Sequence, residues 1–145
     1  MRTKSRVTTD NVGFLLAKAG QRFNELLTER LAERGYPEVR PSYGSVLVPL
    51  FEEGGLRLGD LAGRARLSKQ HTSGLVRLCE GDGLVCRSAD PDDGRATRIS
   101  LTDRGREVQH AAEDVLGQLD EAIVAALGDR RRDALIEALR GVMEL

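Results

Sequence analysis

Six polar side chains between positions 68 and 77 have the chemistry needed to hydrogen-bond the exposed edges of nucleic-acid bases. From about residue 69 to residue 82, small and apolar side chains recur at the i, i+3, i+4, i+7 spacing of one helix face. This inward face consists of Thr72, Leu75, Val76 and Cys79. The outward side then carries Ser68, Lys69, Gln70, His71, Ser73 and Arg77. Such donors and acceptors suit a DNA major groove, although a solvated helix face is the alternative for these residues taken alone.

A helix-turn-helix is the element that would present this face. A short helix is expected to start at Leu58, and its apolar positions are Leu58, Leu61, Ala62 and Ala65. The pattern breaks at residues 67 and 68, where Ser68 is a suitable N-cap because its hydroxyl can accept an unpaired backbone N–H. The helix that follows would be the one that reads the bases.

A β-wing is expected directly after this second helix. Residues 84–87 are β-like, residues 89–94 have turn chemistry, and residues 96–101 alternate again. Arg95 lies at the tip of this hairpin, where it could enter a minor groove, and Asp93 is expected to orient an arginine. Arg98 on the second strand is assigned to phosphate contact, with a solvated charge as the alternative.

These segments resemble the MarR family of winged-helix transcriptional regulators. The most specific part is the wing pattern Asp-Pro-Asp-Asp-Gly-Arg at residues 90–95, followed by Leu-Thr-Asp-Arg-Gly at residues 101–105. The resemblance implies a homodimeric repressor that binds double-stranded DNA at a pseudo-palindromic operator and is released by a small-molecule effector. It also implies an effector pocket between the dimer layer and the DNA-binding head. Candidate contributors to that pocket are Phe14, Phe23, Tyr43 and Arg22 or Arg40.

Long apolar helix patterns occupy both ends of the chain. The first extends from Val12 to Leu31, with Thr8, Thr9 or Asp10 as its cap and Gly35 after its end. A second helix is expected from Pro41 to Gly54. Thr102 caps the longest helix, which Gly128 and Asp129 separate from a last helix containing Leu135, Ile136, Leu139, Val142 and Met143. These stripes could form an intramolecular core, but we favour a dimerisation layer of interleaved terminal helices.

The expected fold is therefore mostly α with a small β-wing, in a single domain over residues 1–145. Residues 8–55 and 102–145 form the helical dimerisation and effector region, and residues 56–101 form the winged helix-turn-helix. The chain has a net charge of −1, yet residues 57–106 hold ten basic and seven acidic side chains, against twelve and sixteen elsewhere. A mildly basic head on an acidic body suits a DNA-binding module, because attraction to phosphate acts over short range.

Other classes of protein are disfavoured by the residue inventory. No glycine-rich phosphate loop or Ser–His–Asp signature is present, so neither catalysis nor a cofactor is expected. Neither histidine lies in a cluster with metal-ligand spacing. Two cysteines and no apolar run of membrane-spanning length favour a cytoplasmic protein without a membrane span, and a redox-sensing Cys86 is a disfavoured alternative. The competing functional hypothesis is a helical protein–protein interaction module that docks an acidic partner.

Overall fold

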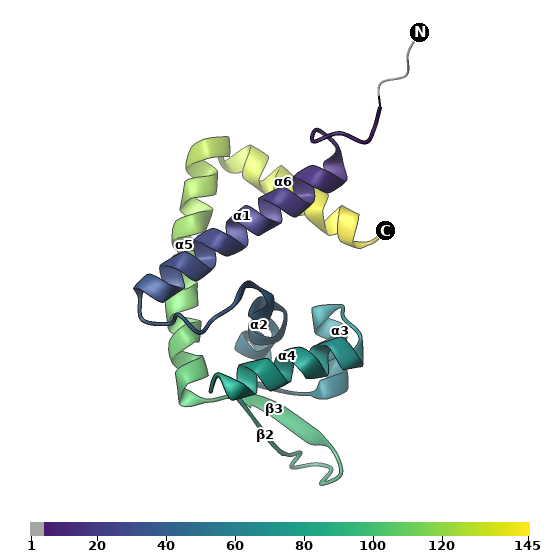
Figure 1. Ribbon diagram of the computed structural model, residues 1–145, viewed down its shortest axis with the longest axis vertical. Helices are drawn as coiled ribbons and strands as arrows, with labels where there is room; N and C mark the ends of the chain where they lie inside the picture. Colours follow the sequence, from purple (N-terminus) through teal and green to yellow (C-terminus); the bar gives the residue numbers. More distant parts are fainter. Residues whose placement is uncertain (1–4) are drawn as a thin grey trace.

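The computed structural model describes residues 5–145 and is mostly helical, with one small antiparallel sheet (Figure 1). Along the described chain the elements are α1 (Val12–Glu33), the 3₁₀ turn η1 (Pro41–Tyr43), α2 (Gly44–Glu53), β1 (Gly55–Arg57), α3 (Leu58–Ala65), α4 (Lys69–Gly81), β2 (Val85–Ala89), β3 (Thr97–Leu101), α5 (Asp103–Leu127) and α6 (Asp129–Met143). Helices α2, α3 and α4 and the sheet form a lower head, whereas α1 and α6 lie above it. The long α5 joins the two layers. The expected fold class is confirmed.

Local capping signals explain several helix ends. Thr102 caps α5 by accepting the N–H of Gly105 at 3.0 Å, as expected, and Gly35 follows α1 with a φ of 97°. The expected cap of α1 is wrong: Asn11, rather than Thr8, Thr9 or Asp10, precedes the helix and accepts the N–H of Gly13 at 2.8 Å. Several adjacent capping residues compete there, and asparagine is as good a cap as serine or aspartate. Where such residues are consecutive, the sequence pattern does not choose among them.

The wing contains one strand more than expected. The sheet order is β1-β3-β2, with both pairs antiparallel, and Leu56 of β1 lies opposite Ile99 of β3. β2 also continues to Ala89, which was expected in the turn, because Ala89 pairs with Thr97. Three residues are too few to display strand periodicity, and Gly54 and Gly55 are more typical of a helix end. Pairing with β3, which lies more than 40 positions away, therefore decides that β1 exists.

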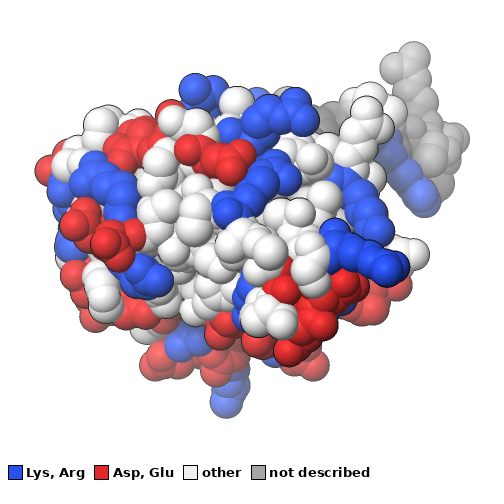
Figure 2. All heavy atoms as spheres, turned by 90° about the horizontal axis from the view of Figure 1, so that it is seen from below, with Lys and Arg blue, Asp and Glu red and all other residues white. Residues whose placement is uncertain are grey.

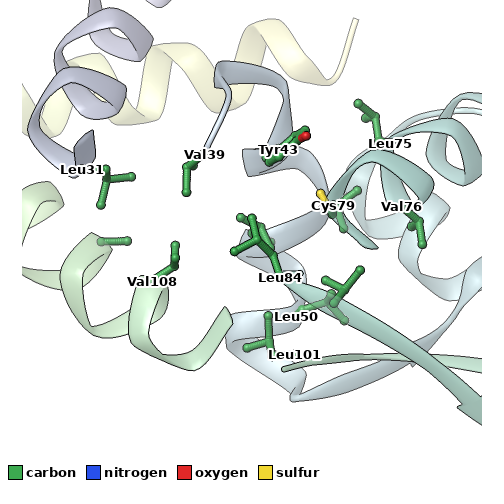
Figure 3. Close-up of a cluster of buried hydrophobic side chains, with 14 of the residues drawn as sticks. Leu31, Val39, Tyr43, Leu50, Leu75, Val76, Cys79, Leu84, Leu101 and Val108 are labelled. Atoms are coloured by element: carbon green, nitrogen blue, oxygen red, sulfur yellow. The ribbon is translucent and has the colours of Figure 1, made fainter. Parts of the chain in front are cut away.

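A single hydrophobic core connects the head to α5 (Figure 3). Its fully buried side chains include Tyr43, Leu50, Leu61, Val76, Cys79, Leu84, Ile99, Val108 and Val115. All four residues of the expected inward face of α4 are buried, which confirms that face. Because α2, α4, α5 and the sheet share these contacts, the orientation of α4 is set by the whole head.

The terminal helices leave apolar side chains exposed. No residue of α6 is buried, and Leu135, Leu139, Val142 and Met143 are each between 38% and 56% exposed. The N-terminal half of α1 exposes Val12, Phe14 and Leu15 in the same way. Within the chain, α5 packs against both α1 and α6 and thereby connects them. In the described part of the chain, no helix has the length and apolar character required to span a membrane.

Candidate nucleic-acid interface

The α3–α4 unit has the geometry of a helix-turn-helix. Arg66 ends α3 in the left-handed region with a φ of 56°, and the N–H of Leu67 donates to the carbonyl of Ala62 at 3.1 Å. Ser68 then caps α4: its Oγ accepts the N–H of His71 at 3.0 Å. The position of the first turn of α4 is therefore determined by two local interactions, of which the sequence predicted the Ser68 cap.

The polar face of α4 points into solvent. Lys69, Gln70, His71 and Arg77 are exposed, whereas Ser73 is half-buried at the edge of that face. Ser68 is exposed, and its Oγ accepts the capping hydrogen bond. Leu78, on the same outer side, is 45% exposed. The structure thus brings five of the six expected residues onto a face with free polar groups, and it gives Ser68 a structural role.

A buried carboxylate organises the wing turn. Asp90 is 4% exposed, and its carboxylate accepts the N–H groups of Asp92 at 2.8 Å and Asp93 at 3.2 Å. It also accepts from Nε of Arg57 at 2.9 Å. The Arg57 guanidinium and these backbone donors hold the pKa of Asp90 at about 2, well below its ordinary value. Asp90 is therefore charged at any physiological pH.

The wing tip presents Arg95. Its backbone N–H donates to Oδ1 of Asp93 at 3.0 Å, so Asp93 orients this arginine through its main chain. The Arg95 side chain is exposed. Arg98, also assigned to DNA contact, is half-buried, and its guanidinium lies 4.0 Å from the Asp90 carboxylate. Arg95 is free to meet a ligand, whereas Arg98 is partly engaged within the protein.

Charged side chains of both signs cover the face seen from below, around a paler uncharged strip (Figure 2). Seven of the ten basic side chains in residues 57–106 lie within 4.0 Å of a carboxylate: Arg57, Arg64, Arg66, Arg87, Arg98, Arg104 and Arg106. Among the described residues, no carboxylate lies within that distance of the other three, Lys69, Arg77 and Arg95. These three belong to α4 and to the wing tip. The uncompensated positive charge of the head is therefore concentrated on its two projecting elements.

Sequence reasoning missed the roles of Arg57 and Asp90. In the sequence, Arg57 is only the residue before an apolar helix, and Asp90 is one of several residues typical of a turn. No spacing rule connects two positions 33 residues apart. This ion pair between a half-exposed arginine and a buried carboxylate arises because β3 pairs with both β1 and β2.

The candidate effector residues lie in different surroundings. Tyr43 is fully buried, and its hydroxyl donates to Asp82 at the end of α4. Phe23 packs against the core, while Phe14 lines a separate open cleft of about 520 Å³ near the start of α1. Arg40 lies over the Tyr43 ring, 6.0 Å from its centroid. A second open hollow of about 370 Å³ is lined by Arg34, Tyr36, Glu107, His110, Ala111 and Asp114.

The two cysteines differ in environment. Burial, with a smaller contribution from Asp82, raises the pKa of Cys79 to about 12, so this thiol stays protonated. Cys86 is exposed on β2, and both are free thiols. Across residues 5–145, no cluster of three or more His, Cys, Asp or Glu side chains could hold a metal ion.

Comparisons with known proteins agree with this architecture. Residues 41–97 match the family model of the MarR family. The repressor NicR of Pseudomonas putida is 25% identical over 136 residues, which is 94% of this chain and 84% of NicR. The regulator BilQ of Clostridioides difficile is 26% identical over 88 residues, and the matched segment is 61% of this chain and 60% of BilQ. The structure of the repressor CouR bound to a 23-mer DNA duplex has a TM-score of 0.77 and 25% identity, covering 99% of each chain.

The matched segment contains η1, both helices of the helix-turn-helix and the wing turn, and the structural similarity extends over the terminal helices as well. With its capped α4, its three-stranded wing and these relatives, the chain is similar to the MarR family of winged-helix transcriptional regulators.

Proposed function

We propose that this protein is a cytoplasmic, sequence-specific DNA-binding regulator that acts as a homodimeric repressor and is released from its operator by a small-molecule effector. It binds DNA and catalyses no reaction. The observation that carries the proposal is the placement of Lys69, Arg77 and Arg95, the cations of the head without a carboxylate neighbour among the described residues. Cations that are not neutralised within the protein are the ones that can neutralise phosphates.

The two projecting elements have different tasks in this proposal. Gln70 and His71, with Ser73 at the edge, supply donors and acceptors to base edges in the major groove. Arg95 enters the adjacent minor groove from a turn whose backbone is already ordered by Asp90 and Asp93. Binding therefore costs little additional ordering of the wing. Arg98 contributes a phosphate contact, because its side chain is 38% exposed although one of its guanidinium nitrogens lies 4.0 Å from Asp90.

The exposed apolar faces of α1 and α6 support the homodimer. Leu15 and Val12 on α1, with Leu139 and Met143 on α6, would be covered by the same helices of a second copy. Two heads related by a twofold axis would then meet two half-sites of a pseudo-palindromic operator. Sedimentation at micromolar concentration should give twice the chain mass of 15.9 kDa. A monomer that binds single half-sites would contradict the dimer.

The repressor part of the proposal rests on the relatives, and the effector part rests on the resemblance to the MarR family. NicR is named a repressor, and CouR is a repressor seen on a DNA duplex. The position of the effector site is left to experiment, because Phe14, Phe23 and Tyr43 lie in different surroundings. Ligand screening by the shift of the thermal unfolding midpoint would identify it, since a ligand that binds only the folded state raises the midpoint.

The direct test separates base reading from backbone attraction. Operator fragments are first selected from genomic DNA, and the best duplex is then titrated beside a random duplex at several salt concentrations. Gln70→Ala should cost about 1–3 kcal/mol on the selected duplex and much less on the random one. Arg95→Ala should weaken binding to both and reduce the salt slope by about one. Arg106→Ala is the matched control, because Arg106 is exposed but already pairs with Asp103 at 2.8 Å.

The competing hypothesis of a protein–protein interaction module has a different outcome. Under it, the wild-type protein would show no preference for any duplex, and none of the three variants would change duplex affinity. An unchanged specificity ratio in Gln70→Ala alone would mean that bases are read by other residues of α4.

A further inference from the structure

Two arginines face each other at the base of the wing. Arg57 of β1 and Arg98 of β3 are directly paired in the antiparallel register. Like charges directly opposite each other on neighbouring strands are destabilising. The Asp90 carboxylate lies between them, 2.9 Å from Nε of Arg57 and 4.0 Å from a terminal nitrogen of Arg98. One buried carboxylate thus holds two half-exposed guanidinium groups.

The backbone is shaped to let Arg98 reach this position. A Cβ atom on Gly55 would lie 2.6 Å from Nε of Arg98 and 2.9 Å from Oγ of Ser100. The Arg98 side chain therefore lies back across β1, over the position that a Cβ on residue 55 would occupy. Gly55, Arg57, Asp90 and Arg98 together form what we call the wing clamp.

The wing clamp connects the tip of the wing to the helix-turn-helix. Arg57 is the residue directly before α3, and α3 packs against α4. At the other end, Asp90 accepts the N–H groups of Asp92 and Asp93, and its own N–H donates to the carbonyl of Ala96 at 2.9 Å. The turn that presents Arg95 is therefore held through one carboxylate to the start of α3.

We propose that Asp90, held between Arg57 and Arg98, is a positioning residue that sets the distance between Arg95 and the reading face of α4, so that both engage neighbouring grooves of one duplex. This inference rests on the proposed function. It assigns Arg57 and Asp90 an indirect role: they act on DNA affinity through Arg95. The low pKa of Asp90, caused first by Arg57, is consistent with a clamp that stays charged.

The experiment measures whether Arg95 still contributes when the clamp is broken. Arg95→Ala is combined with Arg57→Gln, and separately with Asp90→Asn, and affinity for the selected duplex is measured by fluorescence anisotropy at one salt concentration. In the wild-type background, Arg95→Ala should weaken binding about tenfold, the size expected for one specific arginine contact. In either clamp background, the same change should weaken binding less than about threefold, because residues coupled through a shared backbone arrangement are non-additive.

Arg64→Gln is the matched control. Arg64 is on α3, is similarly exposed at 37%, and pairs with Glu53 at 3.1 Å and Glu52 at 3.9 Å; within the described chain it forms no ion pair with a residue of the wing. Its loss removes the same charge, so Arg95→Ala should still weaken binding about tenfold in that background. Arg57→Lys keeps the charge without the planar fork and should restore part of the Arg95 effect.

Hydrogen exchange monitors the clamp in the full-length protein without DNA. The amides of Asp92 and Asp93 should lose protection in Arg57→Gln and Asp90→Asn, while those of Leu75 and Val76 in α4 stay protected. An Arg95 effect of the same size in every background would overturn the inference and leave a purely structural clamp. Failure of the wild-type protein to bind any selected duplex would instead overturn the proposed function, and this inference with it.

Discussion

Replacement of Gly105 by alanine should destabilise the protein by about 2–4 kcal/mol, because the first turn of α5 lies directly against the α4–β2 connection. A Cβ on Gly105 would lie 2.2 Å from the carbonyl oxygen of Leu84, whereas such contacts essentially never fall below 3.0 Å. The carbonyl oxygen of Leu84 belongs to the backbone, so it cannot rotate away. The contact between α5 and the α4–β2 connection must open by about 0.8 Å, and overpacking of this kind costs about 1–3 kcal/mol.

Opening the joint also breaks hydrogen bonds. Thr102 donates its N–H to Leu84 at 3.1 Å and its hydroxyl to the carbonyl of Gly83 at 2.6 Å. Each bond contributes about 1 kcal/mol, while the gain in helix propensity from glycine to alanine returns about 1 kcal/mol. The sum of these terms is the stated loss.

Gly117→Ala is the matched control in the same helix. Nothing lies within 4 Å of a Cβ built on Gly117, so only the propensity gain of up to about 1 kcal/mol should remain. Both variants are unfolded in urea beside the wild type at one protein concentration, because the stability of a dimer depends on concentration. If Gly105→Ala were as stable as the wild type, the close approach of α5 to Leu84 would be refuted.

Three further predictions concern buried groups of the head. Tyr43→Phe should lower stability by about 1–3 kcal/mol, because it leaves the Asp82 carboxylate without the buried hydroxyl donor, and urea unfolding measures this loss. Burial and then the Asp82 contact raise the pKa of Tyr43 from 10.0 to about 12. The stability that this group contributes is therefore complete below pH 10 and is lost between pH 10 and about 12. The decline in stability over this range should be smaller in Tyr43→Phe than in the wild type. The pKa of Asp90 is lowered from 3.8 to about 2, so its contribution is complete above pH 3.8 and lost as pH falls towards 2; acid titration of Asp90→Asn should lack that step.

Much of the head could be predicted from the sequence because its signals are local. The inward face of α4, the Ser68 and Thr102 caps and the turn chemistry of the wing each depend on residues within about two helical turns or one hairpin. Capping groups and apolar periodicity act over that range, so short stretches of chain determine them. The outward side of α4 follows from its inward side, and the candidate interface was located in this way. Where local signals compete, as at Thr8, Asp10 and Asn11, the prediction failed.

Tertiary structure decided everything that depends on which distant segments meet. β1 exists because β3 provides its hydrogen-bond partners, and this pairing brings Arg57 to Asp90 across 33 positions. Tyr43 lies in the core, where its hydroxyl meets Asp82 at the end of α4, 39 positions away. Which arginines remain free is likewise a property of the fold, since an ion pair forms only where the folded chain brings a carboxylate within reach. The sequence by itself determined that the head is basic, and only the three-dimensional arrangement concentrated its unpaired charge on α4 and the wing tip.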